Sequence, residues 1–217
     1  MLLSRLTALP IPSEGAGWST VKRDSNMAAY FLPSGIGGGL YGQVQVAAGE
    51  NQPGQKYFGA RLGYAAGAFD VAVAYGKTQV TSSDDGSIWN LGGSWKLDFA
   101  KLMGYYARQS LADLKQDNWF IAAQAPIGVW LLKASYGEVS RSGQEPWANV
   151  EGQKAKQFAA GAVYDLSKRT ALYGTWSGIN NTDGAKFIVA GLVNVPGGGA
   201  IANGNSQGFE FGLRHSF

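Results

Sequence analysis

The last ten residues of the chain alternate strictly between bulky apolar side chains and small or polar ones. One face of an extended strand would carry Phe209, Phe211, Leu213, His215 and Phe217, and the other Gly208, Glu210, Gly212, Arg214 and Ser216. Because the chain stops on an aromatic residue, we expect its end to be a structural position rather than a frayed extension. A strand with one apolar and one hydrated face is typical of the wall of a membrane barrel.

The same alternation recurs from about residue 27 onward, in pieces of roughly ten residues separated by Gly, Pro, Asn and Asp. In the clearest piece, Trp89, Leu91 and Trp95 alternate with Asn90 and Ser94. We predict about eleven antiparallel strands, over residues 27–32, 40–47, 56–65, 70–78, 88–98, 101–109, 118–125, 129–138, 156–165, 170–179 and 208–217. The stretch 170–179 is ambiguous, because both of its faces are semi-polar.

Connections between these pieces alternate in length. The tight ones are residues 33–38, 66–69, 98–100, 126–128 and 166–169. The longer, polar ones are residues 48–55, 79–86, 110–117, 139–155 and 180–206. Short turns on one rim and long loops on the other are typical of transmembrane barrels, whereas a soluble sandwich has no reason to sort its loops in this way.

Composition excludes several other classes of protein. The 18 basic and 15 acidic residues leave a net charge of only +3, and no basic run exceeds a pair, so we expect no nucleic-acid partner. The absence of cysteine removes thiolate catalysis and thiolate metal sites. The most apolar stretch, residues 187–193, is far shorter than the roughly 20 residues of a membrane helix, which excludes a helical membrane protein.

Aromatic residues gather near the strand ends on the apolar faces. They include Tyr64, Trp89, Trp95, Trp119, Trp130, Tyr136 and Tyr164. Tyrosine and tryptophan favour the two membrane–water interfaces, so these residues are candidates for the aromatic girdles of a barrel. The alternative is that they form the ordinary core of a soluble sandwich, and the sorting of the loops favours the girdles.

Several segments resemble the general diffusion porins of Gram-negative outer membranes, of the betaproteobacterial type. The most specific are Tyr164-Asp-Leu-Ser-Lys-Arg-Thr-Ala-Leu-Tyr173 and the terminal Phe211-Gly-Leu-Arg-His-Ser-Phe217. Residues 26–33, 38–43, 59–65 and 71–76 add to the resemblance, which covers nearly everything from about residue 20 onward.

The resemblance implies a homotrimer of sixteen-stranded antiparallel barrels in the outer membrane, each with an aqueous lumen and no cofactor. In that family the closing strand is a signal for the barrel-assembly machinery. Carried onto this chain, the signal residues are Phe209, Phe211, Leu213 and Phe217. The expected partners are therefore outer-membrane lipid, the assembly machinery and two further copies of the chain.

If the eleven pieces match the last eleven strands of that plan, the resemblance implies a fragment that lacks about the first five. Residues 26–217 would then be a partial barrel domain, and residues 1–25 an irregular remnant of the constriction-loop region or a non-native start. An odd number of strands cannot close as an antiparallel barrel. Residues 1–10 also lack the basic region and apolar stretch of a secretory signal peptide. A truncated remnant without function therefore stays an alternative.

Alternation assigns several charged residues to the inward face. They are Arg61, Lys96, Lys101, Lys133 and Arg214, with Glu210 and Asp165 as the nearest acids. An excess of fixed positive charge on a pore wall favours anions. Arg61 and Lys133 lie in mid-strand and are the best candidates. Alternatively, Arg214 pairs with Glu210, and Lys96 and Lys101 are rim residues beside a turn.

The sequence gives little support to two other classes of function. The only histidine, His215, lies on the apolar register without a nucleophile or acid nearby in sequence, and Asp84-Asp85 reads as a loop tip, so no catalytic or metal site is expected. A soluble ligand-binding barrel would have an apolar interior and a charged exterior, which is the opposite of this pattern. A porin that conducts ions and small hydrophilic solutes by passive diffusion is the function we predict.

Overall fold

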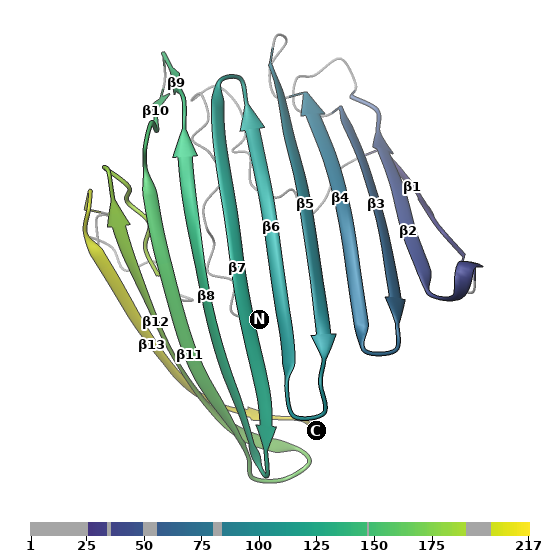
Figure 1. Cartoon of the computed structure of the whole chain (residues 1–217), viewed down its shortest axis with the longest axis vertical. Coiled ribbons are helices and arrows are strands. Elements are labelled where there is room, and N and C mark those ends of the chain that lie inside the picture. Colours follow the sequence, from purple (N-terminus) through teal and green to yellow (C-terminus); the bar gives the residue numbers. More distant parts are fainter. Residues whose placement is uncertain (1–25, 34–35, 50–55, 80–83, 147, 190–200) are drawn as a thin grey trace.

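The computed structural model describes residues 26–33, 36–49, 56–79, 84–146, 148–189 and 201–217, so the predicted irregular segment 1–25 lies outside the described residues. Within these ranges, eleven strands form one antiparallel sheet in which each strand lies beside the next long strand in the sequence (Figure 1). The strands are β1 (Met27–Phe31), β2 (Leu40–Ala47), β3 (Tyr57–Ala66), β4 (Phe69–Gln79), β5 (Asp85–Lys96), β6 (Lys101–Leu111), β7 (Leu114–Ile127), β8 (Trp130–Ser142), β11 (Lys154–Asp165), β12 (Thr170–Thr182) and β13 (Asn205–His215). This arrangement confirms the predicted all-β, antiparallel fold class.

Three small elements lie between these strands. A single 3₁₀ turn, η1 (Ile36–Gly38), joins β1 to β2, and β9 (Gln144–Glu145) pairs with β10 (Ala148–Asn149) between β8 and β11. The described ranges contain no helix that is both long and apolar enough to cross a membrane.

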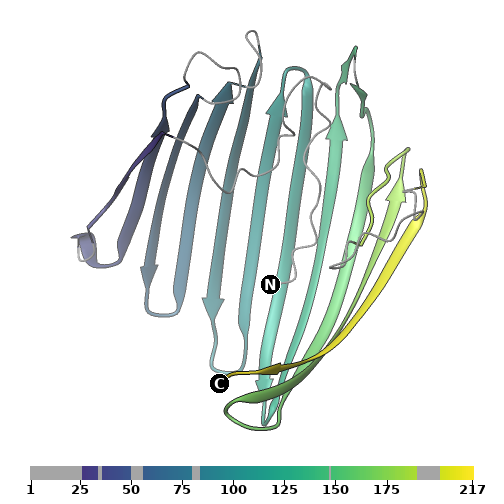
Figure 2. The same ribbon diagram turned by 180° about the vertical axis from the view of Figure 1, so that it is seen from behind.

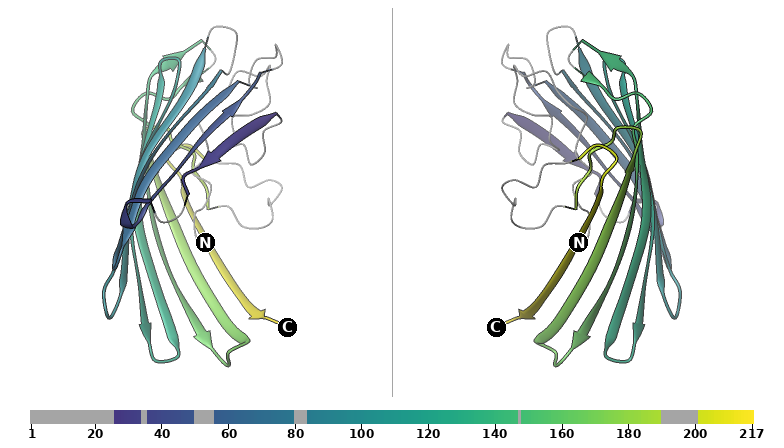
Figure 3. Two further views of the ribbon diagram at one scale, coloured as in Figure 1. Left: turned by 90° about the vertical axis from the view of Figure 1, so that its right-hand side faces the viewer. Right: turned by 90° about the vertical axis from the view of Figure 1, so that its left-hand side faces the viewer.

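The sheet is curved, with a concave and a convex face (Figures 2 and 3). Directly opposed residues of an antiparallel pair share a face, and successive residues alternate, so the register assigns each strand residue to one of the two faces. The chain after β12 lies inside the arc in Figure 3 and packs on Val139, Ala155 and Ile179. These three residues therefore mark the concave face.

Each of the eleven predicted segments corresponds to one strand of the large sheet, including the ambiguous stretch 170–179, which lies within β12. Short turns follow β3, β5, β7 and β11 at one rim, and the connections at the opposite rim are mostly longer, as predicted.

One predicted long connection, residues 110–117, is wrong. Strands β6 and β7 continue to Leu111 and Leu114 and are joined by a turn of two residues. Both leucines are buried and pack with Val150, which the chain between β8 and β11 places over them. This apolar cover stabilises the hairpin beyond the point where the alternation of apolar and polar residues fades.

Other predicted boundaries also differ from the observed ones. The predicted connection 139–155 contains the end of β8, which runs to Ser142, and the β9–β10 hairpin. The last strand spans residues 205–215 rather than 208–217. Ser216 follows it and donates its backbone N–H to the carbonyl of Arg169, 2.9 Å away, so Phe217 lies just beyond the sheet.

The convex face carries two rows of aromatic side chains. Near the short turns the ring pairs are Phe69–Trp95 and Trp130–Tyr164, and nearer the long loops they are Trp89–Tyr106, Trp119–Tyr136 and Phe158–Trp176, with centroids 4.6–5.8 Å apart. Aliphatic side chains such as Val73, Leu91 and Ile121 lie between the rows and are about half exposed. All seven predicted girdle residues lie on this face. An exposed apolar band between two aromatic rows is the surface that a barrel presents to lipid.

Candidate functional site

The register places all six predicted pore-lining residues on the concave face. Lys133 of β8 lies opposite Gln124 of β7, and Gln124 lies opposite Lys101 of β6. The same rule carries this face across the sheet to Arg61 on β3 and, on the other side, to Glu210 and Arg214 on β13. The strands therefore bring to one wall the residues that the sequence assigned to it, and their part in conduction stays a prediction.

Three lysines share one row across the sheet. Lys96 is paired with Lys101, Lys101 with Gln124, and Gln124 with Lys133. Opposed residues lie about 5 Å apart at Cβ, so the Cβ atoms of the three lysines span about 15 Å. Lys96 ends β5 and Lys101 begins β6, so these two residues are at the short-turn rim and on the concave face at once.

Arg61 on β3 is a second basic position of the wall, and its neighbours are Tyr41 on β2 and Asp70 on β4. The Arg61 guanidinium carbon is 5.3 Å from the centre of the Tyr41 ring, which is the geometry of a cation–π contact. The Tyr41 hydroxyl donates to Asp70 Oδ1 at 2.5 Å. An acidic residue of the concave face is therefore held by a tyrosine beside the arginine.

At the other end of the sheet, Arg214 and Glu210 do not form the ion pair that was the alternative for Arg214. They lie four residues apart on one face of β13, which separates their Cα atoms by about 13 Å. Glu210 accepts a hydrogen bond of 3.2 Å from the hydroxyl of Tyr173 instead.

Three ion pairs between strand residues lie on the convex face. They are Lys77–Asp85 at 2.6 Å, Arg108–Asp117 at 2.7 Å and Lys156–Glu138 at 3.7 Å. Of the charged residues that the described strands place on the concave face, six are basic and three are acidic. The concave wall of the described strands therefore carries a net positive charge.

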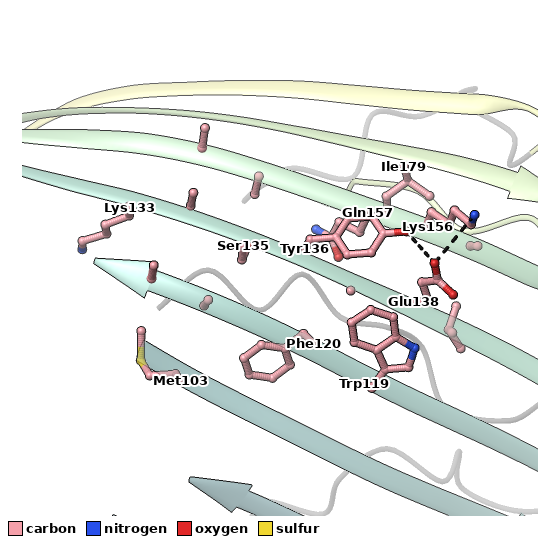
Figure 4. A pocket seen from close by; sticks show the side chains of 18 of the residues that line it. Met103, Trp119, Phe120, Lys133, Ser135, Tyr136, Glu138, Lys156, Gln157 and Ile179 are labelled. Carbon is pink, nitrogen blue, oxygen red and sulfur yellow. Dashed lines mark hydrogen bonds and ion pairs between the residues drawn. The ribbon is translucent and has the colours of Figure 1, made fainter. Parts of the chain in front are cut away.

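A cavity of about 300 Å³ lies beside the lysine row (Figure 4). Its lining includes Met103, Phe120, Lys133, Ser135 and Gln157. Both apolar and polar side chains line the cavity, and Lys133 of the lysine row is one of them. Figure 4 also shows the Glu138 carboxylate bonded to Tyr136 and paired with Lys156.

Sequence reasoning missed one basic residue of this wall, Arg141. It lay within a predicted connection, but the structure continues β8 through it. Its Nε donates to Gln116 Oε1 at 2.6 Å, and Gln116 in turn donates to Asn118 Oδ1 at 3.1 Å. Continuing the two-residue period of β8 from Lys133 to residue 141 was the signal available in the sequence.

The predicted assembly residues Phe209, Phe211 and Leu213 lie on the convex face of β13 and are at least 60% exposed. Phe217 lies beyond the strand and is fully exposed. Searched over the described residues, His, Asp and Glu nowhere form a group of three or more that could hold a metal ion.

A family model described as Gram-negative porin matches residues 7–184. Outer membrane porin protein 32 of Delftia acidovorans is 29% identical over 209 residues, which cover 90% of this chain and 57% of that protein. The solved anion-selective porin from Comamonas acidovorans matches with a TM-score of 0.78 and 26% identity, over 89% of this chain and 60% of that one. This chain thus spans about three fifths of the length of these two relatives.

More distant structures share the fold alone. One is OmpT of Vibrio cholerae, with a TM-score of 0.63 and 13% identity over 94% of this chain and 71% of that one. Another is OmpF of Salmonella typhi, with a TM-score of 0.62 and 16% identity over 88% of this chain and 62% of that one.

Proposed function

Because the chain belongs to the Gram-negative porin family, we propose that its concave face lines a water-filled passage through the outer membrane. Ions and small hydrophilic solutes cross this passage by diffusion, and anions are preferred. The convex face, with its exposed aliphatic band between two aromatic rows, is the side that faces lipid. The alternatives of an enzyme and of a soluble ligand-binding barrel are disfavoured by the family and by this distribution of apolar residues.

The observation that carries the anion preference is the charge of the concave wall. The described strands place six basic and three acidic residues on this wall. A ring or ladder of fixed positive charges raises the local concentration of anions in a pore. One relative is described as an anion-selective porin, which supports the same preference here.

Purified protein is expected to form channels in planar bilayers. A potassium chloride gradient should give a reversal potential of the sign that chloride permeation produces. This preference should be larger in dilute salt, because the Debye length falls from about 30 Å at 0.01 M to about 3 Å at 1 M. A reversal potential of the opposite sign would refute the anion preference, and the absence of channels would refute the passage itself.

The resemblance also leads us to propose a homotrimer that is inserted by the barrel-assembly machinery through its last strand. One solved structure of OmpT is described as a trimer form, which supports a trimer as an arrangement available to this fold. Cross-linking in native outer membranes followed by denaturing electrophoresis tests this state: a monomer band alone would contradict it.

Phe217 offers a test of the assembly signal. Its side chain is fully exposed, and the ring contact described for it is with His215, at 4.9 Å. Phe217→Ser is therefore expected to leave refolding into detergent micelles unchanged and to lower the amount of protein in the outer membrane. Leu166→Ser, at an exposed residue in a turn of the same rim, is the matched control. Equal losses for both variants would contradict a signalling role.

A further inference from the structure

Residues 183–189, here called the inner segment, fold back from the end of β12 onto the concave face. Ala185 and Phe187 are 0% and 5% exposed, and they form one apolar cluster with Val139, Ala155 and Ile179 of the wall. Val189 packs against the same cluster. The apolar stretch 187–193 therefore begins against the wall, and residues 190–193 lie outside the described part.

Asn181 is the first anchor of the inner segment. Its side-chain amide accepts from the backbone N–H of Phe187 at 2.8 Å and donates to the carbonyl of Phe187 at 2.8 Å. It also donates to the carbonyl of Gly204 at 2.7 Å. Asn181 is 3% exposed, so these bonds satisfy a polar group that water does not reach. Removing them would leave backbone groups without partners.

Two further contacts hold the inner segment. The Arg141 guanidinium carbon lies 4.4 Å from the centre of the Phe187 ring, which places the arginine beneath the segment rather than in the open passage. The backbone N–H of Val189 donates to Ser206 Oγ at 3.0 Å. A Cβ added to Gly208 would meet Val189 Cγ1 at 2.8 Å, so this glycine leaves the room that Val189 occupies.

We propose that the inner segment narrows the passage at its long-loop end and holds Lys186 in the path of anions. Lys186 is exposed, while Ala185 and Phe187 on either side of it are buried against the wall. Lys186 therefore lies on the side of the inner segment that is turned away from the wall, on the concave side of the sheet. A cation held at a narrow entrance acts on permeating ions more strongly than one on an open surface. This inference rests on the proposed channel function.

The charge of the inner segment is tested by Lys186→Glu. The variant should move the reversal potential in a potassium chloride gradient toward cation permeation. Lys154→Glu is the matched control, because Lys154 is exposed at the same rim on the convex face. If channels form and prefer chloride, but the two variants give the same reversal potential, the inference is overturned while the proposed function stands.

The anchor is tested by Asn181→Ala, with Asn180→Ala on the opposite face of the same strand as its control. Loss of the three hydrogen bonds should raise the population of a detached, more conductive state about tenfold, which corresponds to about 1.4 kcal/mol. Single-channel recordings should show this as openings to a higher level. Equal level populations in the two variants would overturn the anchoring role.

A disulfide separates detachment of the inner segment from a general loss of folding. The chain has no cysteine, and a Cβ on Gly208 would lie 3.6 Å from that of Val189, within the roughly 3.5–4.5 Å that disulfides span. Adding Val189→Cys and Gly208→Cys to Asn181→Ala should suppress the higher level when oxidised and restore it after reduction. If openings to the higher conductance level are equally frequent in the oxidised and the reduced protein, the inference is contradicted.

Discussion

Leu91→Arg is expected to destabilise the folded protein in a bilayer by about 2–4 kcal/mol, the cost of an arginine on the lipid face near the membrane midplane. Leu91 lies on the convex face of β5 between Trp89 and Trp95, and 47% of its surface is exposed. It packs beside Val73 on the neighbouring strand, which is also apolar and 47% exposed. If this band contacts hydrocarbon, the guanidinium has no aqueous partner there.

Asn90→Arg provides the matched control for this prediction. Asn90 is the adjacent residue of β5 and lies on the concave face, opposite Ala74 and Ala107. An arginine there reaches water and should cost much less. Equilibrium unfolding by guanidinium in phospholipid vesicles, followed by tryptophan fluorescence, gives both free energies. Equal costs for the two variants would show that the convex face does not contact lipid.

The assignment of residues to the two faces was predictable from sequence because the strands keep a strict two-residue period where lipid and water lie on opposite sides. In this zone Trp89, Leu91 and Trp95 alternate with polar or small residues, and a slip of one residue would expose polar groups to lipid. The alternation therefore predicts the wall on which Arg61 and Lys133 lie.

The ends of the strands at the long-loop rim could not be predicted in this way. On β7, Lys115 and Asp117 lie on the convex face, while Gln116 and Asn118 lie buried on the concave face. Beyond the aromatic row nearer the long loops, both faces of β7 are polar. The two-residue period then shows no difference in hydropathy between the faces, and the segment resembles a loop. Its strand conformation is stabilised by contacts distant in sequence, such as the bond from Arg141 to Gln116.

The inner segment illustrates a different limit of sequence reasoning. Phe187 and Val189 belong to an apolar stretch that the sequence makes evident. Their partners, Val139 and Ala155, lie more than thirty residues away, and β12 has to be placed beside β11 before they meet. Asn181 looks like an ordinary loop residue until its amide is seen to bond both Phe187 backbone groups. The pattern identifies an apolar segment, and the tertiary structure identifies what it covers.

Replacing Lys96, Lys101 and Lys133 together by glutamate is expected to reverse the ion preference of the channel. The change converts the described concave wall from six basic and three acidic residues to three basic and six acidic ones. All three lysines belong to one row, and no ion pair is described for any of them. The reversal potential in a potassium chloride gradient should therefore change sign, most clearly in dilute salt.

An equal change of charge on the other side of the wall separates a pore field from net charge. Lys115, Lys154 and Lys156 lie on the convex face near the long loops, so their triple replacement by glutamate gives a protein with the same net charge as the inner triple variant. In this variant the sheet separates the changed charges from the passage. The reversal potential should therefore keep the wild-type sign. If both triple variants reverse the sign, net charge rather than the lysine row sets the preference. If neither does, selectivity arises elsewhere on the wall, and the inner segment with Lys186 becomes the next place to measure.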